Sequence, residues 1–212
     1  MKIQTKEEII VLPGINLHIK LVSNIEELCT EPENEEKIPY WADIWPAARV
    51  MAREIWQKID FKGKEVLELG AGLGLPGITA ALKGGNVTFS DFKDDALKMS
   101  LANAALNGVT NVKTHFGDWR DFNLKKQYEW ILASDLLYNS STNPYAEKVF
   151  ADNLKKNGTL LIAHANRDAT FKSVDRLNKN LFNEKIRKEE KITLDAPYFP
   201  NYKITLHYLV KN

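Results

Sequence analysis

The sequence predicts an α/β fold, in which a mostly parallel sheet of seven strands carries helices on both faces. Three observations lead to this prediction. After residue 60, short apolar runs alternate with amphipathic segments, and a glycine-rich turn follows the first of these runs. At the end of the chain, two strand-like runs follow each other with no helical segment between them. The alternation is typical of parallel β-α-β units, and the final pair indicates an antiparallel hairpin.

The amino-terminal part of the chain has a different pattern. Residues 9–12 and 16–21 are strand-like runs on either side of a Pro-Gly turn, which predicts a small β-hairpin. The acidic stretch over residues 30–37 predicts a solvated loop. We therefore divide the chain into this hairpin with its acidic loop, residues 1–38, packed on the core, and a main domain, residues 39–212.

Hydrophobic periodicity places the elements of the main domain. Helices are expected where apolar residues recur every three or four positions, at about residues 42–58, 75–83, 93–107, 142–155 and 169–181. Strands are expected at short apolar or alternating runs, at about residues 65–70, 86–91, 111–116, 128–134, 158–165, 184–194 and 203–210. The first five strands are separated by helices or loops and should be parallel, and the last two should form the terminal hairpin.

The glycine-rich turn is the strongest functional signal in the chain. Residues 65–77 read EVLELGAGLGLPG, an apolar strand that leads directly into Gly70, Gly72 and Gly74. Because glycine has no Cβ, such a turn bends sharply and lets a ligand approach the backbone. Asp91 ends the next strand, 21 residues after Gly70, where a carboxylate can hold the ribose hydroxyls of a nucleotide. The pattern predicts a cofactor that contains a nucleoside.

The details of the turn favour one class of cofactor. A dinucleotide fingerprint requires a glycine where this chain has Leu75, which disfavours an NAD-linked oxidoreductase, and no Gly-Lys-Ser/Thr phosphate loop occurs. Glu68 would repel a pyrophosphate but suits a ligand with a cationic sulfonium and an amino group. These residues resemble the first motif of class I S-adenosylmethionine-dependent methyltransferases. The resemblance implies a Rossmann-like fold, S-adenosyl-L-methionine as the cofactor, and cofactor contacts from Glu68, Gly70, Ala71, Gly72 and Asp91.

Two segments outside this motif are similar to the seven-strand protein-lysine methyltransferase branch, which includes the enzyme that modifies the β subunit of electron-transfer flavoprotein. Residues 39–48 read PYWADIWPAA, and Trp45 matches the tryptophan that contacts the cofactor in that branch. Asp118 and Trp119 follow the third strand and match its acid-plus-tryptophan element beside the adenine. The resemblance therefore implies that Trp45, Asp118 and Trp119 bind the cofactor.

A third segment, at the end of the fourth strand, resembles the Asp-x-x-Tyr motif of the same branch. The resemblance implies that the Ser134 backbone borders the cofactor, and that Asp135 and Tyr138 face the methyl acceptor as catalytic residues. Tyr40 and Trp41 would complete an aromatic rim around the acceptor. Enzymes that modify adenine or glutamine carry Asn/Asp-Pro-Pro-Tyr/Phe here, whereas this chain reads Asp-Leu-Leu-Tyr, which favours a protein lysine.

Composition gives no support to several other classes of protein. The chain has 29 basic and 28 acidic residues among 212, so it has no overall field to attract nucleic acid or an acidic membrane. The apolar runs are too short to span a bilayer, and the amino terminus has no apolar signal core. Cys29 is the one cysteine, and the four histidines are scattered, so neither a disulfide within the chain nor a metal site is expected. We expect a cytoplasmic protein.

The motifs together predict an S-adenosylmethionine-dependent methyltransferase and favour N-methylation of a protein lysine. Two alternatives stay open. One is a small-molecule N- or O-methyltransferase of the same fold, which a deep closed pocket would favour, whereas an open acidic groove would favour a protein lysine. The other is a binding module that keeps the cofactor site but has lost catalysis.

Overall fold

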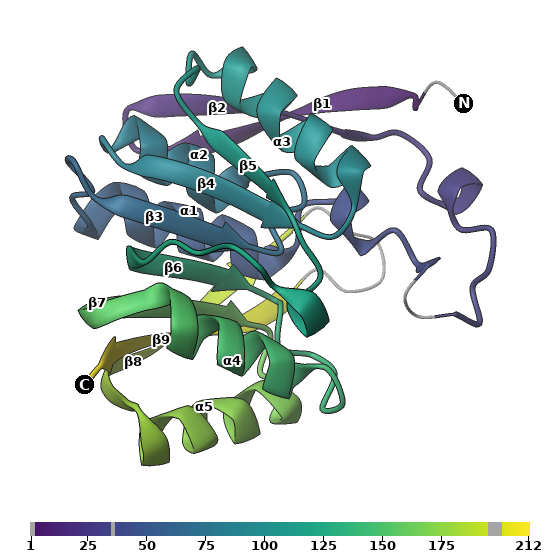
Figure 1. Ribbon diagram of the computed structural model, residues 1–212. Coiled ribbons are helices and arrows are strands. Elements are labelled where there is room, and N and C mark those ends of the chain that lie inside the picture. Colours follow the sequence, from purple (N-terminus) through teal and green to yellow (C-terminus); the bar gives the residue numbers. More distant parts are fainter. Residues whose placement is uncertain (1–2, 35–36, 195–200) are drawn as a thin grey trace.

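The computed structural model describes residues 3–34, 37–194 and 201–212. Within them, β1 (Thr5–Leu12) and β2 (Ile15–Val22) form an antiparallel hairpin that is separate from the main sheet (Figure 1). The turn between them falls at Pro13 and Gly14, as expected. The expected loop between the two final strands lies largely outside the described residues, as do two positions, 35 and 36, of the acidic loop.

The described residues form a main sheet of seven strands. In chain order these are β3 (Glu65–Leu69), β4 (Asn86–Asp91), β5 (Lys113–Phe116), β6 (Tyr128–Ser134), β7 (Leu154–His164), β8 (Phe182–Thr193) and β9 (Asn201–Lys211). Their order in space is β5-β4-β3-β6-β7-β9-β8. The strand β9 pairs antiparallel with β7 and β8, and the other neighbours are parallel. The predicted mostly parallel sheet with a terminal antiparallel hairpin is confirmed.

Helices cover both faces of this sheet (Figure 1). The helices α1 (Pro46–Lys58), α2 (Leu75–Leu82) and α3 (Asp94–Leu106) pack on one face together with the hairpin, and α4 (Asn143–Asn153) and α5 (Asp168–Asn180) pack on the other. Within β3, Val66 faces the first layer, and Leu67 and Leu69 face the second. Both faces of the sheet are therefore buried, which explains why apolar residues of β3 point to both faces instead of alternating with exposed polar residues.

Two asparagines, Asn103 in α3 and Asn107 directly after it, attach the hairpin to the main domain. Asn107 Oδ1 accepts a hydrogen bond from the His18 backbone at 2.9 Å, and its Nδ2 donates to the His18 carbonyl at 2.7 Å. One helical turn earlier, Asn103 makes the same pair of contacts with Lys20, at 2.8 and 3.0 Å. The two amides thus pair with the outer edge of β2 as a neighbouring strand would. Asn103 also donates to the Leu73 carbonyl in the glycine turn at 3.1 Å, which links the hairpin to that turn.

The helix α1 begins four residues later than the sequence predicts. Pro46 occupies its first turn, and Trp45 before it is extended, with φ −68° and ψ 148°. A residue before proline is disfavoured in the helical region, and proline itself fits the first helical turn. The preceding residues, Tyr40–Ala42, form a short 3₁₀ turn, η3, instead. Tyr40, Trp41 and Trp45 therefore lie before α1 and not on it.

The chain reverses direction across the sheet between β3 and β6. From β3 it proceeds outward to β4 and β5, and it then returns to add β6 and β7 on the other side. The crevice outside the carboxyl ends of β3 and β6 is the position where open α/β sheets bind their ligands. The described part of the chain contains no helix that is long and apolar enough to cross a bilayer.

A buried histidine pair joins β7 to β9. His164 and His207 are fully buried, and their Nε2 atoms lie 2.9 Å apart. The Arg167 backbone donates to His164 Nδ1 at 3.0 Å, so neutral His164 carries its proton on Nε2 and donates it to His207. His207 then carries its proton on Nδ1, which lies 2.5 Å from Glu184 Oε1. Burial, with the neighbouring His207, lowers the pKa of His164 to about 3.

We expect this pair to make the folded state sensitive to acid. The pKa of His164 falls from 6.5 in the unfolded chain to about 3 in the fold. Its contribution to the free energy of unfolding is therefore complete above pH 6.5 and is lost as the pH falls towards 3. By about pH 5 the loss in unfolding free energy should be about 2 kcal/mol. Urea unfolding at about pH 7 and about pH 5 measures it. His164→Gln, whose uncharged amide offers a donor and an acceptor in place of the two ring nitrogens, should lose less, and equal losses in the two proteins would contradict this account.

Candidate active site at the carboxyl edge of the sheet

The turn after β3 requires its glycines. Gly70, Gly72 and Gly74 adopt left-handed backbone, with φ of 67°, 52° and 81°. Space is also restricted, because a Cβ on Gly70 would lie 2.8 Å from Leu136 Cδ1 and one on Gly74 would lie 2.9 Å from Ser100 Cβ. The turn therefore presents bare backbone to the cavity that it borders.

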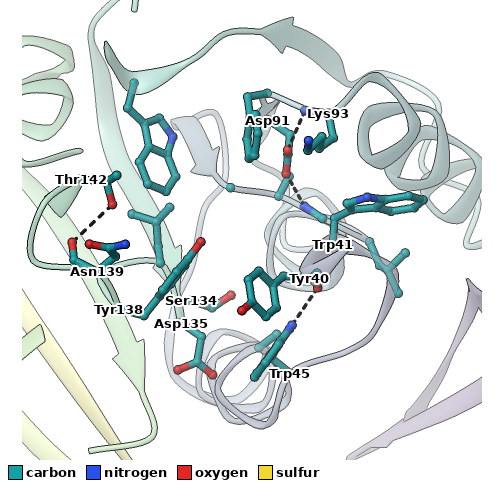
Figure 2. Close-up of a pocket in the computed structure, with 18 of the residues that line it drawn as sticks. Tyr40, Trp41, Trp45, Asp91, Lys93, Ser134, Asp135, Tyr138, Asn139 and Thr142 are labelled. Carbon is teal, nitrogen blue, oxygen red and sulfur yellow. Dashed lines mark hydrogen bonds between the residues drawn. The ribbon is translucent and has the colours of Figure 1, made fainter. Parts of the chain in front are cut away.

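Asp91 at the tip of β4 holds this turn in place. Its Oδ2 accepts a hydrogen bond from the Gly72 backbone at 3.0 Å, and its Oδ1 accepts one from the Lys93 backbone at 3.0 Å (Figure 2). Burial raises the pKa of Asp91, and the two backbone N–H groups act in the opposite direction. A carboxylate that accepts two such bonds retains lone pairs for further donors such as ribose hydroxyls.

A cavity of about 590 Å³ lies at this edge. Its walls come from the segment before α1, the glycine turn, the tips of β4 and β6, the segment after β5 and the loop after β7. The structure brings together at this cavity all but one of the predicted site residues, namely Trp45, Gly70, Ala71, Gly72, Asp91, Asp118, Trp119, Ser134, Asp135 and Tyr138. Tyr40 and Trp41 also line it.

Glu68 is the predicted site residue that does not line the cavity. It is 2% exposed, and its Oε2 accepts a hydrogen bond from the Gly77 backbone in the first turn of α2 at 2.9 Å. Burial raises its pKa well above the ordinary value. A Cβ on Gly77 would lie 2.5 Å from the same oxygen, so the contact is tightly packed. The expected contact with a sulfonium is therefore corrected, because Glu68 faces α2 and braces the helix that follows the glycine turn.

The end of the cavity near β5 is aromatic and polar. Asp118 precedes the short 3₁₀ turn η4 (Trp119–Asp121), and its Oδ1 accepts a hydrogen bond from the Arg120 backbone at 2.9 Å. The Arg120 guanidinium binds both carboxylate oxygens and lowers the pKa of Asp118. The buried Nε1 of Trp119 has no hydrogen-bond partner. An indole ring with an unpaired donor suits a planar base that carries acceptor atoms.

Asp135 lies at the opposite end of the cavity and is strained. It follows β6 with φ 47°, a left-handed conformation that is uncommon for residues other than glycine. Its Oδ1 accepts a hydrogen bond from the Ala165 backbone at 3.2 Å, and its buried Oδ2 forms no hydrogen bond. Burial raises the pKa of Asp135, whereas the Arg167 guanidinium and the backbone N–H groups of Ala165 and Ala47 lower it. A buried carboxylate oxygen without a partner of good hydrogen-bond geometry is uncommon in folded proteins, which makes Oδ2 a candidate acceptor for a ligand.

Three aromatic rings line the cavity beside Asp135, and we call them the aromatic wall. The rings of Tyr138 and Tyr40 meet edge to face with centroids 5.7 Å apart, and those of Tyr40 and Trp45 meet in the same way at 5.8 Å. Trp45 Nε1 donates to the Tyr40 carbonyl at 2.8 Å (Figure 2). Aromatic faces attract methyl and ammonium groups through the charge distribution of the ring.

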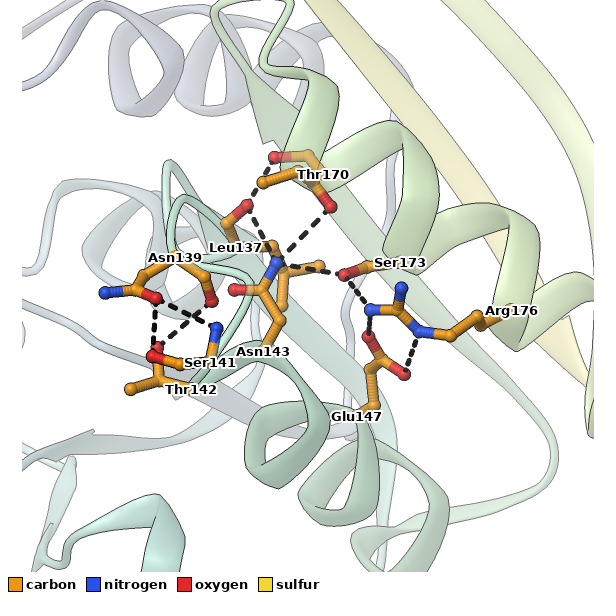
Figure 3. A network of polar contacts seen from close by, with 10 residues as sticks. Leu137, Asn139, Ser141, Thr142, Asn143, Glu147, Thr170, Ser173 and Arg176 are labelled. Carbon is orange, nitrogen blue, oxygen red and sulfur yellow. Dashed lines mark hydrogen bonds and ion pairs between the residues drawn. The ribbon is translucent and has the colours of Figure 1, made fainter.

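A buried polar network supports the loop that carries Tyr138. Asn143 Nδ2 donates to the Leu137 carbonyl at 3.2 Å and to Ser173 Oγ at 3.0 Å, and Thr170 Oγ1 donates to the same carbonyl at 2.8 Å (Figure 3). Asn143 begins α4, whereas Thr170 and Ser173 belong to α5. Both helices therefore hold the loop after β6 in one position.

Arg167 is a cavity residue that the sequence motifs did not single out. It follows β7, and its Nε lies 3.4 Å from Asp135 Oδ1. Its guanidinium carbon also lies 5.9 Å from the centroid of the Trp45 ring. Arg167 has no motif of its own, but its position directly after a parallel strand next to β6 could have indicated it, because ligand sites form at such ends.

The fold is that of the class I methyltransferases. It has their strand order, and a glycine turn and a strand-tip carboxylate lie at the carboxyl edge of the sheet. The chain belongs to the lysine methyltransferase family, whose sequence profile matches residues 26–188. The family resemblance predicted from the motifs is thus confirmed. Among solved structures, the N-methyltransferase NodS from Bradyrhizobium japonicum, in complex with S-adenosyl-L-homocysteine, superposes with a TM-score of 0.65 at 16% identity, covering 88% of this chain and 97% of that one.

Several relatives of known name match the chain in part. Histidine protein methyltransferase 1 homolog of Dictyostelium discoideum is 37% identical over 113 residues, 50% of this chain and 37% of that protein. Protein N-lysine methyltransferase METTL21A of Danio rerio is 39% identical over 111 residues, 49% and 50% of the two chains. Electron transfer flavoprotein beta subunit lysine methyltransferase homolog of Caenorhabditis elegans is 27% identical over 154 residues, 66% and 62%. The matches therefore span about half the length of these relatives.

Proposed function

We propose that the chain is an S-adenosylmethionine-dependent methyltransferase that modifies a side-chain nitrogen of a protein, with lysine as the favoured acceptor. The observation that carries the proposal is the buried, unpartnered Oδ2 of Asp135 beside the aromatic wall, at the opposite end of the cavity from Asp91. Membership of the lysine methyltransferase family supports the proposal. The relatives named above are, by their names, lysine and histidine methyltransferases of proteins, which favours a protein nitrogen.

The cavity residues fit the cofactor, since Gly70, Gly72 and Gly74 leave bare backbone at the cavity and the Trp119 donor is unpaired. Asp91 would accept hydrogen bonds from the ribose hydroxyls, Trp119 and Asp118 would lie beside the adenine, and Trp45 would flank the methionine part. The remaining backbone contacts would come from Gly70, Ala71, Gly72 and Ser134. S-adenosylmethionine supplies a methyl group already activated on a sulfonium, so the protein's task is mainly to align the reactants and exclude water.

The acceptor half of the site would position a nitrogen for in-line attack. A lysine amine has an ordinary pKa near 10.4, so it must lose a proton before its lone pair can react. Asp135 Oδ2 would accept a hydrogen bond from the acceptor nitrogen, and water at the cavity mouth would take the proton. The N–C bond then forms as the methyl–sulfur bond breaks. Tyr138 and Tyr40 would hold the methyl group and the nitrogen against their rings.

The charged residues of the cavity are mixed in sign, so they do not form the acidic groove that would favour a protein lysine. Four carboxylates line it (Asp43, Asp91, Asp118 and Asp135), and so do three cations (Lys93, Arg120 and Arg167). The acceptor would therefore be selected by Asp135 and the aromatic wall rather than by a long-range negative field. We also propose that the protein acts in the cytoplasm, since Cys29 is its one cysteine and is not paired.

Transfer of labelled methyl groups tests the proposal directly. Purified chain is incubated with tritiated S-adenosylmethionine and a lysate whose own small molecules have been removed or retained in parallel samples. We expect label in protein bands, and acid hydrolysis of those bands should release methylated lysine. Label that appears only in small molecules would support the small-molecule alternative. Cofactor binding without any labelled product would identify a silent binding module.

A further inference from the structure

The loop after β7 holds Arg167 at a defined place beside Asp135. The Ala165 backbone donates to Asp135 Oδ1, and the Arg167 backbone donates to the buried His164 ring. Between them, Asn166 Oδ1 accepts a hydrogen bond from Thr205 Oγ1 on β9 at 2.5 Å. Three successive residues are thus anchored, so the base of the Arg167 side chain has little freedom. Its outer part, 38% exposed, lies between Asp135 and the Trp45 ring.

A carboxylate alone at this position would oppose the reaction that it helps to orient. A negative charge next to an amine raises the pKa of the amine and stabilises its ammonium form. The ammonium has no lone pair and cannot attack the methyl carbon. Asp135 would therefore bind a lysine well and hold it in its unreactive form, unless a positive charge compensates.

We propose that Arg167 is the residue that compensates, so that the acceptor nitrogen meets a nearly neutral Asp135–Arg167 pair and reacts as the uncharged amine. Arg167 acts through Asp135 and is a tuning residue, not one that exchanges a proton. Arginine suits this role because it stays protonated at any working pH, whereas a buried lysine readily loses its charge. This inference rests on the proposed function, and it adds that the acceptor nitrogen reacts in its uncharged form.

The other titratable groups near this pair do not replace Arg167. The ones that face it or lie behind it are Tyr40 and Tyr138 of the aromatic wall, Asp43 before α1, and the His164–His207 pair with Glu184 and Arg187. Asp43 is exposed, and its Oδ1 accepts from the Ile44 backbone at 2.7 Å. Burial keeps His164 uncharged by lowering its pKa, and Arg187 pairs with Glu184. Lys93 and Arg120 line other parts of the cavity, beside Asp91 and Asp118.

Ligand binding measures the charge at the transfer position without any acceptor. In sinefungin a carbon that carries an amino group replaces the sulfur that carries the methyl group, and S-adenosylhomocysteine carries no charge there. Calorimetry gives the ratio of their affinities for the wild type, Arg167→Gln and Arg167→Lys. We expect Arg167→Gln to raise the preference for sinefungin about tenfold, because a carboxylate then faces the amino group alone. Arg167→Lys should keep the ratio within about twofold, and Lys172→Gln, an exposed cation of α5 outside the cavity, should not change it.

The pH dependence of methyl transfer provides a second readout that a merely structural role would not change. Loss of Arg167 should raise the pKa of the bound amine by about one unit, so the midpoint of the rise in transfer rate with pH should lie about one unit higher in Arg167→Gln than in the wild type, and the variant should be about tenfold slower at any pH below both midpoints. The assay follows tritium transfer to lysate protein. A structural defect would lower the rate without moving this midpoint.

The two measurements separate the possible failures. If the wild type binds both ligands but Arg167→Gln leaves their affinity ratio unchanged, or leaves the midpoint of the pH–rate curve where it is in the wild type, the role of Arg167 is overturned and the proposed function stands. If the wild type binds neither ligand, the proposed function falls and this inference falls with it.

Discussion

Asp91→Ala should weaken binding of S-adenosylmethionine by about tenfold to a hundredfold, because loss of a charged hydrogen-bond acceptor costs about 1.5–3 kcal/mol. The structure supports an effect towards the upper end of this range. The same carboxylate accepts hydrogen bonds from the Gly72 and Lys93 backbones, so its removal also releases the turn that would border the cofactor. Calorimetric titration with S-adenosylmethionine and with S-adenosylhomocysteine measures the loss.

A matched control for this prediction lies three residues away. Asp94 begins α3, is exposed and pairs with Lys98, but does not line the cavity. Asp94→Ala therefore removes a carboxylate from the same segment and should leave cofactor affinity within about twofold of wild type. Thermal melting establishes that both variants are folded. Unchanged affinity in a folded Asp91→Ala protein would rule out the ribose role, and tighter binding of NAD than of S-adenosylmethionine would overturn the choice of cofactor.

Asp135→Asn should bind S-adenosylmethionine almost normally but transfer methyl groups at least about a hundredfold more slowly. Asparagine keeps the shape of the side chain and tolerates the left-handed backbone at this position, where φ is 47°. It removes the negative charge that we expect to orient the acceptor nitrogen. The loss should therefore fall on the transfer step, measured as labelled methyl incorporation under saturating cofactor.

Asp168→Asn is the corresponding control, since Asp168 is an exposed carboxylate at the start of α5 that does not line the cavity. Its transfer rate should stay close to that of wild type. If Asp135→Asn transfers at the wild-type rate, Asp135 serves only to end the strand. If its cofactor binding collapses instead, the carboxylate belongs to the cofactor site and the acceptor mechanism must be assigned to other residues.

Helices and strands that are marked by neighbouring residues could be predicted closely from the sequence. The helix α3 and the strands β3, β4 and β6 lie within a residue of their predicted bounds, because hydrophobic period and terminal residues are properties of neighbouring positions. The glycine turn and Asp91 could be placed together for the same reason, since two consecutive parallel strands bring their carboxyl ends to one edge. The start of α1 was predicted too early because the apolar spacing continues through residues that Pro46 excludes from the helix.

The direction of the Glu68 side chain could not be predicted from the sequence, because it depends on the fold. Glu68 lies between Leu67 and Leu69, and its motif position suggested a ligand contact. The pleat directs it to the opposite face from those two leucines, where its Oε2 accepts a hydrogen bond from the Gly77 backbone. The motif identified an important residue, but its partner depends on how α2 packs against the strand.

The chain's sequence thus established its class, its glycine turn and a set of residues that line its cavity, because these follow from short-range order along the chain. Contacts between distant segments were established by packing. Arg167 meets Asp135 because β7 lies beside β6, Asn103 binds both the hairpin and the glycine turn because α3 crosses them, and His164 meets His207 because β9 inserts antiparallel next to β7. No local pattern encodes these pairs, since each depends on which strands and helices become neighbours when the apolar layers close.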